Sequence, residues 1–432
     1  MSRRFENWSG RHAFVPNAWE EPEGEAQVAA LVRWAQAHGR RLKVIGAAHS
    51  WSDIGVPDDV LVSLDRIAGL RALDPDARLA TVGGGTRLRH LLAALGARGF
   101  TLPIVGSITE QSISGVIATG THGSSLVHGN IASFVEGMRL VTGTGEILDL
   151  RAGDPRLAAA RVGLGALGVI TELTLRVEPA FNLCEEVSIL PIADAVADLP
   201  AIARSAEYVK VWHTPHTGLA QVFRYHRTHE PARPRPLARW IDEKIVNRGL
   251  FDALLRLAGR HPAIVPPLNR AIARAYLGPS RRVDVGHRAL SLAMPARHRE
   301  CEYAVALERA SEALARTLAL IERERIRVNF ILEARFVPAD DAWMSPAFGR
   351  DTCQLGAYMA ESPDLQRYFR GFEALMQDLG GRPHWGKELT LTPAQVRARF
   401  PMATAFTELR RRLDPDAVFA NAFLDRVLGP LH

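Results

Sequence analysis

The spacing of hydrophobic positions near the start of the chain predicts a helix followed by a strand. A helix is expected over residues 25–38, because apolar side chains recur there three or four positions apart, at Val28, Leu31, Val32 and Ala35. Gly39 is placed to end this helix. Residues 41–45 then read as a short strand that runs into a loop of small residues.

The same reasoning extends along the chain. Strands are predicted at residues 60–64, 79–82, 134–141, 146–150 and 169–177, and a helix at 87–99. Pro179 marks a domain boundary, beyond which the sequence is richer in Arg, His and Pro. There the pattern predicts helical regions at 237–275 and 302–322, strands at 209–213 and 328–336, and a packed closing segment at the C-terminus. The second region is therefore predicted to be mixed α+β.

Two loops of small residues, at 46–50 and 106–123, are the strongest functional signal in the sequence. Loops of this kind bring backbone N–H groups close to a ligand, as phosphate-binding loops do. Each loop also holds one histidine, His49 and His122. Together the loops predict a large anionic cofactor lying between them.

Two other glycine patterns favour structural roles. Residues 163–168 match the Gly-x-Gly-x-x-Gly dinucleotide fingerprint, but a strand follows where that motif needs a helix. Residues 83–85 do precede a predicted helix, yet the acidic ribose partner expected about 20 residues later is missing. We interpret the first as a close approach into a strand and the second as a turn.

Composition narrows the class of protein. The 432 residues favour two to three domains, and an apolar fraction of 47% with a charged fraction of 23% is ordinary for a globular protein. The net charge is +6 and the charges are interspersed, so a small anionic ligand is favoured over nucleic acid.

Cysteine and histidine usage argues against metal and disulfide chemistry. The three cysteines are far apart, and no His-Glu-x-x-His motif occurs, so neither a disulfide framework nor a metal site is expected. No transmembrane stretch or signal-peptide core is present in the sequence, which favours a cytoplasmic protein.

The motifs, taken in order, resemble those of a known family. Residues 13–178 resemble the FAD-binding domain of vanillyl-alcohol-oxidase-type flavoproteins, through Pro16, residues 41–50, the loop from Gly106 to Gly115, residues 119–124 and residues 165–170. Residues 179–432 resemble the substrate domain of the sugar-1,4-lactone oxidase branch, through residues 302–305, 333–335, 382–387 and 414–421.

The resemblance implies an α+β, two-domain FAD-binding fold of the PCMH type with a mixed α+β substrate (cap) domain. It implies an FAD-binding domain at 1–178 and a substrate domain at 179–432, with residues 380–432 returning to the flavin site. His49 matches the histidine that relatives often link covalently to FAD, with non-covalent FAD as the alternative. The implied cofactor-binding residues are Val44, Ile45, Gly46, Ala47, Ala48, His49, Ser50, Gly106, Ser107, Ser112, Gly115, Thr119, Gly120, His122, Gly123, Gly168 and Ile170.

The resemblance also places catalytic residues in the second domain. Glu333 and Arg335 stand two apart on a predicted strand, hence on one face, where a carboxylate and a guanidinium reach the same pocket. Arg335 is expected to hold the substrate oxygen or the reduced flavin, and Glu333 to orient a substrate hydroxyl or Arg335. Lys387 is the preferred base or polarising group, beside His384. Ser107 aligns with a position that contacts substrate.

Two positions bear on acceptor and substrate. Relatives with glycine at the place of Gly106 leave oxygen a path to the flavin, which favours an oxidase. Tyr358 stands where many relatives carry a histidine, so the substrate is expected to differ from the usual aldonolactone.

The sequence therefore predicts an FAD-dependent oxidase of a sugar-1,4-lactone or related polyol that forms hydrogen peroxide. A dehydrogenase using a quinone or cytochrome, an alditol oxidase, and a non-catalytic basic binding protein remain as alternatives.

Overall fold

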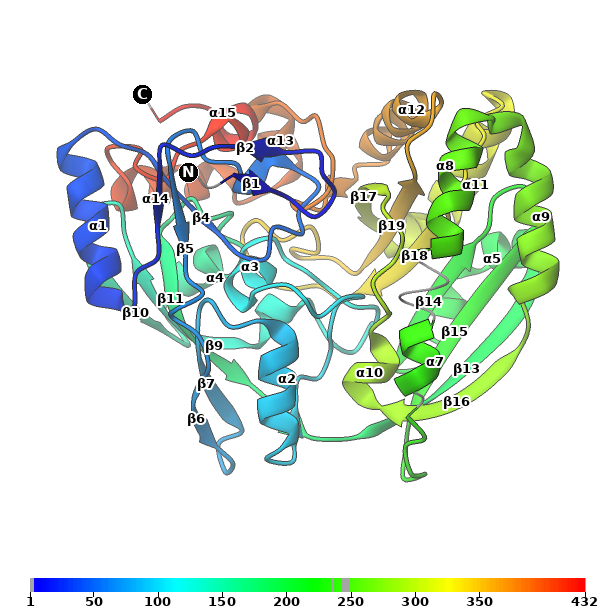
Figure 1. The fold of residues 1–432 in the computed structure, drawn as a ribbon, viewed down its shortest axis with the longest axis horizontal. Coiled ribbons are helices and arrows are strands. Elements are labelled where there is room, and N and C mark those ends of the chain that lie inside the picture. Colours follow the sequence, from blue (N-terminus) through cyan, green and yellow to red (C-terminus); the bar gives the residue numbers. More distant parts are fainter. Residues whose placement is uncertain (1–3, 235, 242–248, 432) are drawn as a thin grey trace.

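The computed structural model describes residues 4–234, 236–241 and 249–431. Two groups of strands stand side by side, as Figure 1 shows, with the N-terminal residues in blue on one side and the green and yellow residues of the second half on the other. Among the described residues, every helix is too short or too polar to span a bilayer.

The first half begins with a small parallel sheet in the order β3-β5-β4. Its strands are β3 (Ala18–Glu20), β4 (Leu42–Ile45) and β5 (Val60–Ser63), and helix α1 (Glu25–Ala37) connects the first two. The predicted apolar stripe of α1 is largely the face that packs, since Val28, Val32 and Ala35 are buried. Strand β4 delivers the chain directly into the small-residue loop at 46–50.

A five-stranded antiparallel sheet in the order β10-β9-β11-β7-β6 completes the first half. Its strands are β6 (Leu70–Asp74), β7 (Leu79–Gly83), β9 (Val135–Val141), β10 (Ile147–Arg151) and β11 (Val169–Arg176). The helices of this half are α2 (Leu88–Gly96), α3 (Ile113–Ala118) and α4 (Pro155–Arg161). Two short pairs, β1 (Phe5–Glu6) with β2 (Ala13–Phe14) and β8 (Phe100–Thr101) with β12 (Glu178–Pro179), lie outside these sheets.

The second half is built on an eight-stranded antiparallel sheet in the order β16-β13-β15-β14-β18-β19-β17-β20. Its strands are β13 (Asn182–Pro191), β14 (Tyr208–His213), β15 (Leu219–Thr228), β16 (Ser280–Val285), β17 (Arg299–Ala306), β18 (Leu332–Val337), β19 (Thr352–Met359) and β20 (Arg382–Pro383). Its helices are α5 (Ile192–Ala197), α6 (Leu199–Ala203), α7 (Pro236–Ile241), α8 (Asp252–Arg260), α9 (Val265–Tyr276), α10 (Gly286–Leu290), α11 (Ala310–Arg323) and α12 (Leu365–Asp378).

Side-chain alternation gives this sheet an apolar face and a polar face. On β18, Leu332, Ala334 and Phe336 belong to the apolar core that includes α11 and α12, whereas Glu333 and Arg335 point the other way. Strands β17 and β19 alternate in the same sense. The polar face therefore gathers charged groups from several strands at one place.

The expected helix at 302–322 is wrong over its first part. Residues 299–306 form strand β17, which pairs with β19 and β20, and the helix α11 begins at Ala310. The strand expected at 328–336 begins only at Leu332. Pairing on both sides of β17 decides its conformation, because long-range partners override a local helical pattern.

The other expected elements are found within a few residues of their predicted bounds. The helical region predicted at 237–275 comprises α7, α8 and α9, while its residues 242–248 lie outside the described residues.

Close packing explains the glycine patterns at residues 163–168 and 83–85. A Cβ on Gly168 would lie 2.5 Å from the carbonyl oxygen of Val141, and a Cβ on Gly84 would collide with the carbonyl of Ile170.

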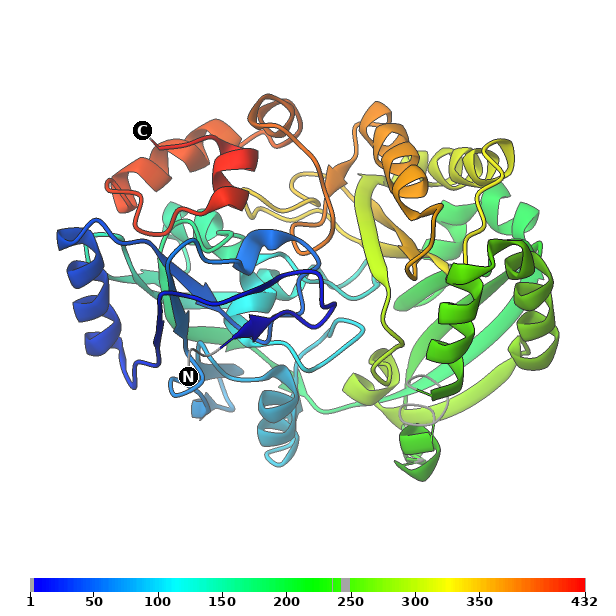
Figure 2. The same ribbon diagram turned by 45° about the horizontal axis from the view of Figure 1, so that its top comes forward.

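The C-terminal segment returns to the first half. It contains α13 (Pro393–Arg399), α14 (Ala403–Leu413) and α15 (Ala422–Leu428), drawn in orange and red beside the blue N-terminal elements in Figures 1 and 2. The N–H of Leu42 on β4 donates to the carbonyl of Val418 at 2.7 Å. Asp414 fixes the turn before α15 by accepting from the N–H groups of Val418 and Phe419. The predicted packed closing segment is confirmed.

Candidate active site

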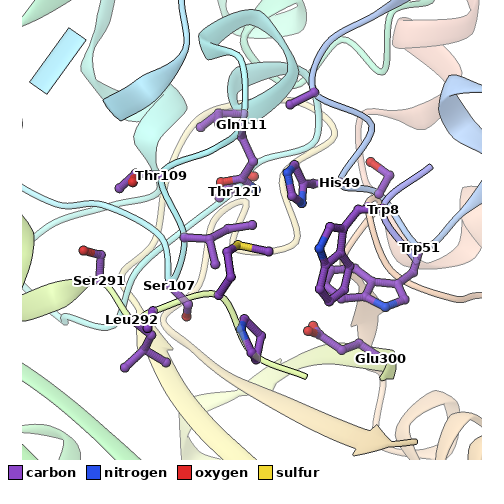
Figure 3. A pocket seen from close by; sticks show the side chains of 18 of the residues that line it. Trp8, His49, Trp51, Ser107, Thr109, Gln111, Thr121, Ser291, Leu292 and Glu300 are labelled. Atoms are coloured by element: carbon purple, nitrogen blue, oxygen red, sulfur yellow. The ribbon is translucent and has the colours of Figure 1, made fainter. Parts of the chain in front are cut away.

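A cavity of about 1620 Å³ is lined by residues of both halves. This is larger than the range of about 300–1,000 Å³ typical of ligand pockets. One wall is formed by the two small-residue loops, and the opposite wall by the polar face of the eight-stranded sheet and the segment 384–387. Figure 3 shows His49, Trp8 and Trp51 on one side of this space, with Ser107 and Leu292 on the other.

Most of the predicted site residues line this cavity. From the first half they are Val44, Ile45, Gly46, Ala47, Ala48, His49, Ser50, Ser107, Ser112, Gly115, Thr119 and His122. From the second half they are Glu333, Arg335, Tyr358, His384 and Lys387. The fold thus brings together residues that are more than 300 positions apart in sequence.

Five predicted cofactor-binding residues do not line the cavity: Gly106, Gly120, Gly123, Gly168 and Ile170. Ile170 is buried in the core of the first half. A Cβ on Gly123 would lie 2.5 Å from the Ile104 side chain, so this glycine allows close packing of the loop. Gly106 lies just behind the wall, where a Cβ would come 3.1 Å from Cγ2 of the lining residue Thr121.

His49 lies on the loop after β4, next to Ala48, whose φ of 56° turns the chain sharply. The imidazole stacks on Trp8 with ring centres 5.9 Å apart. Its Nδ1 atom is buried and has no hydrogen-bond partner. Burial lowers the pKa of His49 to about 4, assisted by the positive charges of Arg87 and Lys387, so the imidazole is neutral at pH 7.

Several cavity-lining polar atoms are buried without a partner. They include Lys43 Nζ, His49 Nδ1, Gln111 Oε1 and Ser112 Oγ. Buried polar groups in folded proteins are rarely left unsatisfied, so this set predicts a polar ligand along the loop wall. The backbone fits close approach as well, since a side chain on Gly46 would collide with Ser112. These residues therefore fit an extended anionic cofactor such as FAD.

Glu333 is held by three partners on the opposite wall. Trp212 Nε1 donates to Glu333 Oε1 at 2.6 Å, and the Tyr358 hydroxyl donates to Oε2 at 2.6 Å. Arg335 Nε lies 3.3 Å from the same Oε2, which confirms that the two residues share one face of β18. Burial, together with the charge of Glu333, raises the pKa of Tyr358 well above its ordinary value, so it acts as a donor.

Arg335 is also anchored from behind by Glu302 of β17. Arg335 Nη2 donates to Glu302 Oε1 at 2.7 Å, and His122 Nε2 lies 3.2 Å from the same oxygen. Burial by itself would raise the pKa of Glu302. The opposing effects of Arg335 and His122 are stronger and hold the pKa of Glu302 well below its usual range. Arg335 Nη1 reaches Ser107 Oγ at 3.4 Å. This network fixes the guanidinium against the cavity.

His122, Glu302 and His384 come close enough together to suggest a metal site, with ligand atoms within 4.8 Å of one another. The guanidinium of Arg335 already neutralises Glu302. His384 Nδ1 accepts from the Gly386 N–H at 3.0 Å, and burial lowers the pKa of His384 to about 4. We therefore interpret the cluster as a polar network around the Arg335–Glu302 ion pair that supports Arg335.

Lys387 lies on the segment after β20, and its ammonium group is 4.0 Å from the centre of the Trp51 ring. It binds Glu300 Oε2. Burial lowers the pKa of Lys387 to about 7, which makes the neutral amine accessible near neutral pH.

Lys43, Glu300 and Glu302 line or support the site but were not predicted from the sequence as site residues. A signal for the two glutamates was present, because polar residues at 300 and 302 alternate with apolar ones at 301, 303 and 305. That alternation is typical of a strand with one polar face.

Comparisons with known proteins agree with this geometry. The profile of a family described as D-arabinono-1,4-lactone oxidase matches residues 173–427, more than half of the chain, and that of an FAD binding domain matches residues 16–151. The chain belongs to the D-arabinono-1,4-lactone oxidase family. The predicted sugar-1,4-lactone oxidase branch is thereby confirmed, and residues 16–151 belong to an FAD-binding domain.

Relatives of this lactone oxidase family member include proteins named as dehydrogenases and proteins named as oxidases. An L-gulono-1,4-lactone dehydrogenase of Mycobacterium tuberculosis (strain H37Rv) is 35% identical over 431 residues, 100% of both chains. An alditol oxidase of a Streptomyces species is 31% identical and covers 99% of this chain and 100% of its own. The L-gulonolactone oxidase of Bos taurus is 28% identical over 98% of each chain.

The fold of this family member also matches a solved structure. The crystal structure of cholesterol oxidase from B. sterolicum superposes with a TM-score of 0.84 over 99% of this chain and 96% of that one, at 16% identity. The predicted α+β, two-domain FAD-binding fold is confirmed.

Proposed function

We propose that the protein is an FAD-dependent oxidase of a sugar-1,4-lactone or related polyol that passes electrons to oxygen and forms hydrogen peroxide. The observation that carries this proposal is the meeting of Glu333, Arg335 and Lys387 on one wall of a cavity whose other wall holds His49 and the small-residue loops. Such a cavity can hold a flavin and a hydroxylated substrate together.

We divide the chain into an FAD-binding domain at 1–178 and a substrate domain at 179–432, with residues 380–432 returning to the flavin site. The loop residues at 44–50 and 107–122 would hold the FAD, and Lys43 would face an anionic part of it. Bound FAD would supply the acceptor for the hydride that the substrate carbinol loses. A cytoplasmic location stays a prediction.

A covalent bond between His49 and FAD is part of the proposal. Two features support it: Nδ1 of His49 is free of hydrogen bonds, and the imidazole is neutral and therefore nucleophilic. Stacking on Trp8 holds the ring in one orientation. Such a link prevents loss of the cofactor.

Arg335 and Glu333 bind and orient the substrate. The guanidinium is fixed by Glu302 and Glu333, so its remaining donors are preorganised toward an oxygen in the cavity. Glu333 orients Arg335 or a substrate hydroxyl. Tyr358 and Ser107 lie beside this pair and offer hydroxyls to a polyol.

Lys387 accepts the hydroxyl proton as the carbinol loses its hydride. With its pKa near 7, it is partly neutral at physiological pH and suited to general-base work. His384, three residues earlier, supports the turn through its bond to the Gly386 N–H and lines the same wall.

Gly106 favours oxygen as acceptor, because relatives with glycine at this place leave oxygen a path to the flavin, and a Cβ here would press on the lining residue Thr121 at 3.1 Å. A dehydrogenase of the same substrates, using a quinone or cytochrome, is the second candidate. The observation that favours it is the relative named L-gulono-1,4-lactone dehydrogenase, 35% identical over the whole chain.

The test uses purified protein. Its visible spectrum is recorded before and after acid precipitation, and oxygen uptake is followed with a panel of aldonolactones and alditols. Flavin kept in the pellet of the native protein but lost in the His49→Ala variant, with peroxide formed from one substrate, supports the proposal. Dye reduction without oxygen uptake supports the dehydrogenase, and a protein without flavin contradicts both.

A further inference from the structure

Lys387 stands at one end of a line of three titratable side chains. Its ammonium group binds Glu300 Oε2, and the other oxygen of Glu300 lies 2.7 Å from Nε2 of His298. His298 and Glu300 are each only 5% exposed. Nothing in the proposed reaction explains why a histidine stands behind this carboxylate.

The hydrogen bonds of His298 determine where its protons lie. Nδ1 is 2.7 Å from the carbonyl oxygen of Ala296, which can only accept, so Nδ1 carries a proton. A lone pair on Nε2 facing an ionised carboxylate at 2.7 Å would be repulsive. One proton therefore lies between Nε2 and Glu300 Oε1, bound to one atom or the other.

Both positions of this proton give the pair of His298 and Glu300 the same net charge. With the proton on Nε2, imidazolium and carboxylate cancel, and with the proton on Oε1 both groups are neutral. Burial lowers the pKa of His298, whereas a carboxylate 2.7 Å away favours the imidazolium. In either case Lys387 faces a neutral pair instead of a bare carboxylate.

We propose that His298 is a positioning residue that neutralises Glu300, so that Glu300 holds Lys387 in place without fixing it as an ammonium. A bare carboxylate in contact with a lysine would favour the charged form. The burial that lowers the pKa of Lys387 to about 7 is then left unopposed. The use of Lys387 as a base rests on the proposed function, whereas the charge of the pair does not.

Among the residues that the structure describes, the other groups around Lys387 bring no negative charge that could replace this arrangement. His49 interacts with Lys387 from the loop wall and is neutral at pH 7 because burial lowers its pKa to about 4. Glu388, the next residue in the chain, is bound by Arg299 at 2.6 Å.

Aromatic rings enclose His298 on its remaining sides. They belong to Trp8, Trp51, Phe330 and Tyr358. Burial raises the pKa of Tyr358 well above its ordinary value, so its hydroxyl is uncharged. The closest ring is that of Phe330, stacked at 4.5 Å, so a phenylalanine in place of His298 keeps the packing while it removes the proton.

The titration of Lys387 can be observed directly. The chain contains four lysines, at positions 43, 210, 244 and 387, so lysine labelled with ¹³C at Cε gives four NMR signals in the holoenzyme. The Lys387→Met variant assigns the signal of interest by its loss. We expect a midpoint of about 7 for Lys387 in the native protein.

Three variants test the charge of the pair. His298→Phe leaves Glu300 ionised, so the midpoint of Lys387 should rise to about 8 or above. Adding Glu300→Gln to His298→Phe removes that charge and should return the midpoint to about 7. Glu300→Gln alone should leave it near the native value. If His298 only supported the packing, removing the charge of Glu300 in the double variant would not return the Lys387 midpoint to its native value.

Two controls are built into the chain. The signal of Lys43, whose pKa burial also lowers to about 7, should stay unchanged in all three variants. His213→Phe makes the same substitution at another histidine that is 5% exposed and bound to the Leu219 carbonyl but outside the cavity. It should leave the Lys387 midpoint at its native value.

Two results would overturn the proposal: an unchanged Lys387 midpoint in folded His298→Phe protein, or a clear drop of the midpoint in Glu300→Gln alone. The second shows that Glu300 is an ordinary counter-ion, and it decides the question even if His298→Phe does not fold. The NMR titration needs no turnover. A protein that oxidises no lactone or polyol therefore fails the proposed function while the charge of the pair is still measured.

Discussion

The Tyr358 hydroxyl donates to Glu333 Oε2 at 2.6 Å across two neighbouring strands, and a glycine makes this contact possible. Gly356 is the direct partner of Glu333 in the pairing of β18 with β19. A Cβ on Gly356 would lie 2.8 Å from the Tyr358 ring. The tyrosine ring thus occupies space that any other residue at 356 would fill, and Tyr358 becomes part of the cavity wall.

Loss of the Tyr358 hydroxyl should weaken substrate orientation. Tyr358→Phe removes a hydrogen bond to a charged acceptor and should lower kcat/KM about tenfold, equivalent to about 1.4 kcal/mol. Steady-state kinetics with the substrate found in the panel measures this. Tyr303→Phe is the matched control, because its hydroxyl bonds Glu373 outside the cavity. A kcat/KM equal to that of the native enzyme in Tyr358→Phe would contradict the role of the hydroxyl.

Filling the space at Gly356 should displace Tyr358. Gly356→Ala forces a clash with the ring and should cost about 1–3 kcal/mol of unfolding free energy as well as activity. Urea unfolding and kcat/KM measure the two effects. In the double variant with Tyr358→Ala the ring is absent, so the alanine at 356 should cost little further stability. An equal cost in both backgrounds would show that the ring is not the obstacle.

Asp340 should make stability depend on pH in mildly acidic solution. Burial raises the pKa of Asp340 to about 6, so between about pH 4 and 6 the folded state binds a proton that the unfolded state has released. The free energy of unfolding contributed by this group therefore falls as pH rises through that window. Asp340→Asn should remove this slope in urea titrations at pH 4 to 7. Asp341→Asn, at a side chain 74% exposed, should keep it.

A methyl group at position 106 should slow the reaction with oxygen. In Gly106→Ala the new Cβ lies 3.1 Å from Cγ2 of Thr121, which lines the cavity, so the methyl group crowds this part of the cavity wall. We expect severalfold slower oxygen uptake with unchanged rates of dye reduction. Gly278→Ala serves as control, since a Cβ there meets no atom within 4 Å. Equal losses with oxygen and with dye would mean that the substitution affects substrate oxidation instead.

Local patterns predicted most elements because their packing follows local periodicity. Helix α1 buries Val28, Val32 and Ala35 as its spacing predicts. Residues 302–306 were predicted as part of a helix, although Glu300 and Glu302 alternate with apolar residues. Their strand conformation depends on pairing with β19 and β20, which are distant in sequence. The sequence of such a short segment does not reveal these distant partners.

The loop wall of the site could be predicted, because backbone approach to a ligand demands small residues at consecutive positions. His49 stood out there because it is a histidine within a loop of small residues. The support behind Arg335 and Lys387 could not be predicted. Glu302 and Glu300 act through residues 33 and 87 positions away, and only the pairing of strands brings them within hydrogen-bond reach.

The sequence by itself determined the family, the α+β two-domain fold and the two loops of small residues, because these depend on residue types at fixed spacing. Only the tertiary structure decided which polar and charged groups face one another: Arg335 against Glu302, Tyr358 against Glu333, and Lys387 against Glu300 with His298 behind it. Charge interactions depend on distance and burial. Both are set by the packing of strands and loops that lie far apart along the chain.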